Sequence, residues 1–212
     1  MRTIAAIELS SAHESLAVAV LTRAFMDDPI YSYVFPDETL RAKYTHILWK
    51  ALIHTCRLFG RVYTTPTIDG VACWTAPGKT ELSIGRAFRS GFAIPLAVMR
   101  FPAKARRRMF KALSVLDRER RRLMTGPFWY LQVLGVEPTR QGLGLGSSLI
   151  APVLAIADIQ GLPCYLETET EANVAFYEKR GFTVKTNLKF PGPGLQLWTM
   201  ERSPSPTSQA AA

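Results

Sequence analysis

The sequence predicts a single α/β (α+β) domain in which helices flank a sheet. Hydrophobic residues make up 48% of the 212-residue chain and charged residues 20%, which is typical of a globular protein with one core. Strand-like and helix-like hydrophobic periods alternate along the chain. We expect the domain to span residues 1–202 and the Ser-, Pro- and Ala-rich segment 203–212 to form a disordered tail.

The N-terminal half is predicted to contain two long helices followed by a hairpin. Apolar periodicity indicates the helices, and Pro29 and Pro36 interrupt the pattern between them. The expected elements are a strand at 3–9, a helix at about 12–26, a loop or broken helix at 26–38, a helix at 38–59, and paired strands at 61–65 and 69–77.

The C-terminal half is predicted to alternate strands and helices. Its clearest strand is GPFWYLQVLGVEP, which is rich in aromatic and β-branched residues. The expected elements are a basic helical insertion at 80–124 kinked near Pro95 and Pro102, a strand at 126–138, a helix ending near 160, a strand at 163–169, a helix that begins near 171 and ends at Gly181, and strands at 182–190 and 195–202.

The formal net charge of +9 is concentrated in one segment. Between Arg100 and Arg122 there are ten Lys or Arg residues against Asp117 and Glu119, a local excess of eight. A solvated helix face is the simplest interpretation, and an anionic cofactor or partner is the alternative. A nucleic-acid partner is disfavoured because aromatic residues are not interleaved with the basic ones.

Cysteine content and hydropathy indicate a reduced, cytoplasmic protein. Cys56, Cys73 and Cys164 are odd in number and widely spaced, which fits neither a disulfide framework nor a metal site. No apolar run approaches the ~18 residues that a membrane-spanning helix needs. The N-terminus reaches Glu8 after a short apolar stretch, so we expect no signal peptide and no membrane partner.

The segment TRQGLGLGSSLI places Gly142, Gly144 and Gly146 immediately before an apolar helix. Such a turn leaves backbone N–H groups free at a helix start, where an anion can bind. A Walker loop is excluded because Cys73 stands where the first glycine before Gly78-Lys79-Thr80 would fall. A dinucleotide fingerprint fails because position 147 is a serine.

Two motifs together resemble the GNAT superfamily of N-acetyltransferases. The first is Gln141-x-x-Gly144-x-Gly146 after a strand, and the second is the run EANVAFYEKRGF thirty residues later. The layout is most similar to the small-molecule branch that includes puromycin N-acetyltransferase. The resemblance implies a mixed, mostly antiparallel sheet that splays between the strands at 129–136 and 163–168.

The resemblance also implies acetyl-CoA as the co-substrate, with its pyrophosphate on the backbone amides of the glycine loop. Small residues let the backbone approach phosphate, and the dipole of the following helix favours negative charge. The implied CoA-binding residues are Leu134, Gly135, Val136, Gln141, Gly142, Leu143, Gly144, Leu145, Gly146, Ser147, Asn173 and Tyr177.

The implied reaction is direct attack by a free amine on the thioester. Tyr177 would protonate the departing thiolate, while Glu167 and Asp28 are candidate bases that could equally cap a helix or pair with an arginine. Backbone amides near residues 134–136 would stabilise the developing negative charge. Candidate walls of the substrate pocket are Asp28, Tyr31, Tyr33, Trp74 and Trp129, with core packing the competing role of the tryptophans.

The sequence therefore predicts an acetyl-CoA-dependent N-acetyltransferase that acts on the primary amine of a drug-like molecule or metabolite in a ternary complex. Two alternatives are a GNAT-like module that binds acyl-CoA without turnover and a protein N-acetyltransferase. The acceptor, the acyl-chain preference and the oligomeric state are not encoded in any motif that we recognise.

Overall fold

The computed structural model describes residues 4–80, 89–189 and 194–205. Its helices are α1 (Glu14–Ala24), α2 (Pro29–Val34), α3 (Glu38–Phe59), α5 (Ala93–Met99), α6 (Ala103–Leu123), α7 (Leu145–Gln160) and α8 (Glu171–Glu178). Its strands are β1 (Ile7–Glu8), β2 (Gly60–Thr64), β3 (Gly70–Thr75), β4 (Trp129–Val136), β5 (Cys164–Thr168), β6 (Thr183–Lys189) and β7 (Gln196–Arg202).

The strands form one sheet in the order β1-β2-β3-β4-β5-β7-β6. Every neighbouring pair is antiparallel except β4 and β5, which are parallel. The helix α7 connects these two strands, as a parallel pair requires a crossover. The predicted mixed, mostly antiparallel sheet flanked by helices is confirmed.

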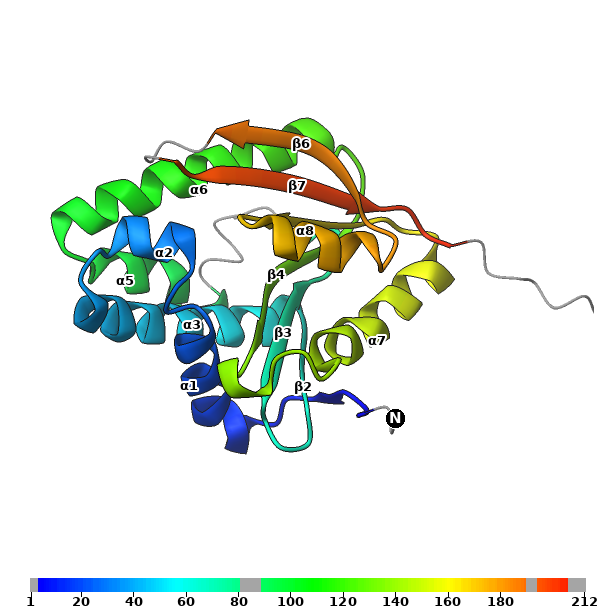
Figure 1. Cartoon of the computed structure of the whole chain (residues 1–212), viewed down its shortest axis with the longest axis horizontal. Coiled ribbons are helices and arrows are strands. Elements are labelled where there is room, and N and C mark those ends of the chain that lie inside the picture. Colours follow the sequence, from blue (N-terminus) through cyan, green and yellow to red (C-terminus); the bar gives the residue numbers. More distant parts are fainter. Residues whose placement is uncertain (1–3, 81–88, 190–193, 206–212) are drawn as a thin grey trace, which may run out of the picture.

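Helices cover both faces of the sheet (Figure 1). Successive side chains of β3 point to opposite faces of the sheet. Val71 and Cys73 pack with α1 and α3 on one face, whereas Ala72 and Trp74 pack with α7 on the other. Both faces of this central strand are therefore buried, and its residues read as a continuous apolar run.

The sheet opens between β4 and β5. These strands pair only at Trp129↔Cys164 and Tyr130↔Tyr165, so the rest of β4 has no strand partner on that side among the described residues. A register shift opposite Cys73 and Trp74 adds Gln132 to β4 as an extra residue, and such a bulge bends a strand. The splay creates space between two otherwise adjacent strands.

The basic segment forms two helices that lie across the sheet from α7 (Figure 1). Pro95 is accommodated in the first turn of α5, where its missing N–H has no helical partner to lose, and Pro102 immediately precedes α6. Residues 81–88 of the predicted insertion lie outside the described residues. Within the described part, no helix is long and apolar enough to cross a membrane.

The remaining differences from prediction are local. The first strand is only Ile7–Glu8 rather than 3–9. The segment predicted as a loop or broken helix contains the short helix α2, whose first turn Pro29 starts and the Asp28 side chain caps. Most of the predicted tail, 206–212, lies outside the described residues.

Candidate active site

The glycine loop begins α7 without a side-chain cap. Gly144 is the N-cap residue with φ +78° and Gly142 has φ +76°, the left-handed region that glycine adopts without strain. A Cβ added to either glycine would meet no atom within 4 Å, so both face open space. The first N–H groups of α7 have no intrahelical acceptor and can bind an anion there.

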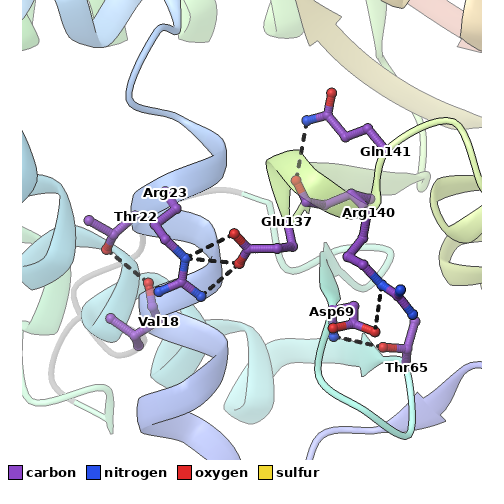
Figure 2. A network of polar contacts seen from close by, with 9 residues as sticks. Val18, Thr22, Arg23, Thr65, Asp69, Glu137, Arg140 and Gln141 are labelled. Carbon is purple, nitrogen blue, oxygen red and sulfur yellow. Dashed lines mark hydrogen bonds and ion pairs between the residues drawn. The ribbon is translucent and has the colours of Figure 1, made fainter.

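Polar contacts hold the approach to this loop in place (Figure 2). Arg23 of α1 donates two hydrogen bonds, of 2.9 and 2.7 Å, to one carboxylate oxygen of Glu137 at the end of β4. Arg140 pairs with Asp69 at 3.5 Å, and Gln141 Nε2 donates to the Val136 carbonyl at 3.3 Å. The backbone between β4 and α7 is therefore tied to α1 and to the β2–β3 turn.

A cavity of about 450 Å³, here called the loop cavity, lies between this loop and α8. Arg140 and Arg180 both line it. Arg180 lies over the Phe176 ring at 3.5 Å and donates to Ser147 Oγ at 3.1 Å from its Nε. Two guanidinium groups and a helix start surround the cavity, so its electrostatics fit a phosphate-bearing ligand.

Most of the predicted CoA-binding residues meet in the loop cavity. Those that line it are Leu134, Val136, Gln141, Gly142, Gly144, Leu145, Gly146, Ser147, Asn173 and Tyr177. Gly135 and Leu143 do not. A Cβ at Gly135 would lie 2.7 Å from Leu21, so this glycine allows α1 to pack against β4, and Leu143 is 48% exposed outside the lining.

A second cavity of about 200 Å³, here called the acidic cavity, lies under α2, α5 and α6. Its walls are mostly apolar, including Trp49 from α3, and α6 contributes Met109, Ala112 and Leu116. The two cavities share Leu134, Asn173 and Tyr177. The splay between β4 and β5 thus leads from the loop cavity into the acidic cavity.

Three carboxyl groups line the acidic cavity, and none of the described lining residues is Lys, Arg or His. Burial raises the pKa of Glu167 from 4.5 to about 7, although Tyr130 donates a 2.7 Å hydrogen bond to its Oε2. The other oxygen, Oε1, is buried without a hydrogen-bond partner among the described residues. The hydroxyl of Tyr165 and the charge of Arg120 also act to lower the pKa of Glu167, so protein groups surround this carboxyl.

The other two carboxyl groups come from α2 and from the chain beyond β5. Asp28 Oδ1 accepts from the N–H groups of Ile30 and Tyr31 at 3.0 Å each, which confirms its capping role. Burial nevertheless raises the pKa of Asp28 from 3.8 to about 6. Burial, followed by the charges of Asp28 and Glu167, raises the pKa of Glu169 well above its ordinary value.

Tyr177 lies where the cavities meet. It is 8% exposed, and its ring contacts Phe176 and Phe182 edge to face. Burial and then the charge of Glu169 raise the pKa of Tyr177 above its ordinary value, so its hydroxyl stays protonated at neutral pH. A protonated hydroxyl at this junction can donate to a group that reacts there.

The predicted substrate residues divide into two groups. Asp28 and Tyr31 line the acidic cavity. Tyr33 instead lies beside Arg108, whose guanidinium carbon is 5.1 Å from its ring centroid. Trp74 and Trp129 belong to the core against α7, and Trp129 Nε1 donates to Gln160 at 2.8 Å, so their placement as pocket walls is corrected.

Sequence reasoning missed Glu169, Arg180 and the apolar face of α6. Glu169 follows Glu167 at the two-residue spacing that puts strand residues on one face, which could have suggested it. Arg180 lies four residues after Phe176 on the same helical side. No local signal places α6 over a cavity, because that contact is long-range.

Comparison with known proteins supports the motif-based expectation. The model of the Acetyltransferase (GNAT) family matches residues 110–182. An uncharacterized N-acetyltransferase of Schizosaccharomyces pombe is 27% identical over 202 residues, covering 92% of this chain and 81% of that protein.

Two solved structures share the fold. One, from Corynebacterium glutamicum and described as histone acetyltransferase HPA2 and related acetyltransferase, has a TM-score of 0.65 at 18% identity and covers 96% of this chain and 98% of its own. Arylalkylamine N-acetyltransferase 2 of Aedes aegypti has a TM-score of 0.61 at 15% identity, covering 94% and 98%. Residues 110–182 match the GNAT family model, a relative over most of the chain is named an N-acetyltransferase, and the fold is that of solved acetyltransferases, which together indicate that the chain is an acetyltransferase.

Proposed function

We propose that the protein transfers the acetyl group of acetyl-CoA to the primary amine of a small molecule. The observation that carries this proposal is the meeting of two unlike cavities at Leu134, Asn173 and Tyr177. The loop cavity has free helix N–H groups and two arginines for the phosphates of CoA. The acidic cavity has carboxyl groups for an amine, which is cationic near neutral pH.

The size of the acidic cavity favours a small acceptor over a protein. About 200 Å³ holds a compact molecule, whereas a polypeptide acceptor needs a groove for the residues on either side of its amine. The similar fold of an arylalkylamine N-acetyltransferase is consistent with this choice. The resemblance to the puromycin branch points the same way, toward a drug-like or metabolite amine.

The acceptor amine must lose a proton before it can attack. A lysine-like amine with pKa ~10.4 is neutral in only about one molecule in a thousand at pH 7. Glu169 is the carboxyl group whose charge acts on Tyr177, and Asp28 in turn acts on Glu169. We assign proton removal to this pair rather than to Glu167, whose Oε2 already accepts a hydrogen bond from Tyr130.

The chain's residues then have complementary tasks. The neutral amine nitrogen forms a bond to the acetyl carbon while the carbon–sulfur bond breaks, and Tyr177 gives its proton to the leaving sulfur. The attacking nitrogen loses its second proton as the amide forms, and that proton restores the hydroxyl of Tyr177. The unpaired edge of β4 beyond Tyr130 offers backbone N–H groups for the charge that develops on the acetyl oxygen. Products are an amide and CoA, and the proton taken by the carboxyl pair is released to solvent.

Calorimetric titration with acetyl-CoA, followed by assays of CoA release with a panel of amines, tests the proposal. We expect saturable acetyl-CoA binding and amine-dependent CoA release confirmed by the mass of the acetylated amine. Glu169→Gln should lower kcat about 100-fold or more, whereas Glu171→Gln, an exposed change on α8, should not. Binding of acetyl-CoA without acetylation of any amine would instead indicate the non-catalytic module.

A further inference from the structure

A third cavity contains part of the positive charge that the sequence concentrates between Arg100 and Arg122. It has a volume of about 430 Å³, is here called the basic cavity, and is lined by Tyr33 from α2 and by Lys104, Arg107, Arg108 and Lys111 from α6. It shares no described lining residue with the loop cavity or the acidic cavity. The phosphates of acetyl-CoA, which we place in the loop cavity, therefore do not account for it.

The four cations of the basic cavity lie on one face of α6. Residues three and four apart are neighbours on a helix surface, and the stretch from Lys104 to Lys111 spans only about 10 Å at ~1.5 Å per residue. Like charges at these spacings repel one another, so their grouping is unfavourable without a counter-charge. Met109 and Ala112 line the acidic cavity instead, so the charged face and the apolar face of this helix serve different cavities.

These four cations have no acidic partner in the part of the chain that the structure describes. None of them takes part in an ion pair there, and the sequence contains no Asp or Glu from residue 82 to residue 116. The ion pairs within α6 lie in its C-terminal half, around Asp117 and Glu119. Positive charge is thus matched in the second half of the helix and unmatched in the first.

One of the cations, Arg108, is fixed in position by α2. Its Nη1 donates a 2.8 Å hydrogen bond to the carbonyl oxygen of Tyr33, and its guanidinium carbon lies 5.1 Å from the centroid of the Tyr33 ring. A guanidinium has five N–H donors, so this bond leaves others for a ligand. The first turn of α6 has neither a side-chain cap nor an acidic residue, so the helix dipole adds positive potential near Lys104.

We propose that the basic cavity binds a compact polyphosphate anion, a di- or triphosphate chain that is either free or part of a nucleotide. Guanidinium groups bind phosphate oxygens in pairs, and lysines add point charges. A short phosphate chain carries several negative charges within the ~10 Å that the four cations span. A nucleic-acid duplex would require basic residues that continue along the surface, but Arg118, farther along α6, pairs with Glu119 at 3.5 Å. Binding in the basic cavity is independent of acetyl transfer.

Calorimetric titration with inorganic triphosphate at constant ionic strength tests the proposal, with the protein alone and with acetyl-CoA present at saturation. We expect saturable binding of triphosphate with a Kd that acetyl-CoA leaves unchanged, because the two cavities share no lining residue. Inorganic monophosphate should bind more weakly, since it contacts fewer of the cations. Tighter binding of ATP than of triphosphate would identify a nucleotide as the source of the phosphate chain, and the reverse order a free polyphosphate.

The double variant Arg107→Gln/Lys111→Gln should raise the Kd of triphosphate about tenfold or more, as the loss of charge-assisted hydrogen bonds allows. Both side chains are exposed, so the variant should keep the Tm of the unmodified protein. The matched control, Lys50→Gln/Arg118→Gln, removes one lysine and one arginine from exposed positions outside the basic cavity and should leave the Kd nearly unchanged.

Four outcomes would overturn the proposal. Absence of saturable triphosphate binding, or an equal loss of affinity in the two double variants, would show that the charged face of α6 is only solvated surface. Displacement of triphosphate by acetyl-CoA would place the anion in the loop cavity. Tighter binding of duplex DNA than of triphosphate, abolished by Arg107→Gln/Lys111→Gln, would indicate a nucleic-acid surface instead.

Discussion

Replacing Gly144 by alanine should separate the role of the glycine loop in ligand binding from its role in folding. Gly144 has φ +78° at the start of α7, and Gly161 has φ +64° at the end of the same helix. A Cβ at either position meets no atom within 4 Å, so neither variant creates a clash. Of these two glycines, only Gly144 lines the loop cavity. Gly161→Ala is therefore a control with matched backbone strain.

The two variants should have similar stability and different affinity. Placing alanine in the left-handed region costs about 1 kcal/mol, which lowers Tm by about 2–4 °C in a chain of this size. The methyl group of Gly144→Ala also projects into the space beside the free N–H groups. Loss of one charge-assisted hydrogen bond there costs about 1.5–3 kcal/mol, or about 10- to 100-fold in the Kd of acetyl-CoA.

Thermal melts and calorimetric titration of both variants provide the comparison. We expect Gly161→Ala to bind acetyl-CoA with unchanged Kd, and Gly144→Asn to recover Tm without affinity, because asparagine tolerates the left-handed region. Equal acetyl-CoA affinity in Gly144→Ala and the unmodified protein would refute the placement of the phosphates on this loop. A matching loss in Gly161→Ala would show that affinity depends on helix stability alone.

Three further predictions address the reacting residues and the core. Tyr177→Phe should lower kcat roughly tenfold or more while the Kd of acetyl-CoA stays the same, and an unchanged pH–kcat profile would exclude its acid role. Because burial raises the pKa of Glu167 to about 7 and of Asp28 to about 6, the folded state holds these protons more tightly than the unfolded chain. Their contribution to the unfolding free energy of the ligand-free protein is full below their ordinary values of 4.5 and 3.8 and is lost as pH rises through about 7. Denaturant melts from pH 4 to 8 should show a flatter pH dependence for Glu167→Gln, and an identical slope would contradict the raised pKa. Trp129→Phe should cost about 1–3 kcal/mol of stability through the lost contact with Gln160 while kcat/KM is unchanged, and a specific loss of activity would return Trp129 to the substrate site.

The parts of the site that were predictable from sequence are those whose geometry is local. Gly142 and Gly144 adopt positive φ because the loop must turn into α7 within a few residues. The spacing of these glycines in the sequence predicts that turn. Asn173 and Tyr177 share a helix face by their separation of four residues. Such features depend on neighbouring residues, so a motif captures them.

The parts that were not predictable depend on register and on contacts across the fold. The positions of Trp74 and Trp129 depend on which face of the sheet each side chain occupies. The register shift at Gln132 changes how side chains alternate between the two faces along β3 and β4. The charge pattern of α6 made it resemble a solvated helix. Met109 of α6 and Leu197 of β7 belong to one hydrophobic cluster, which also contains residues of α2. The position of α6 over the acidic cavity follows from this packing.

The position of α6 also explains how a chain of net charge +9 can contain an acidic cavity. The helix turns apolar residues such as Met109 toward the cavity and keeps most of its arginines at the surface, so its charge is screened by solvent. Of the two cavities that meet at Tyr177, only the loop cavity has guanidinium groups in its described lining, those of Arg140 and Arg180. An anionic co-substrate and a cationic acceptor would therefore be drawn to opposite sides and meet at Tyr177. An anionic acceptor would have to pass three carboxyl groups, so charge alone would select against it before any contact with the reacting atoms.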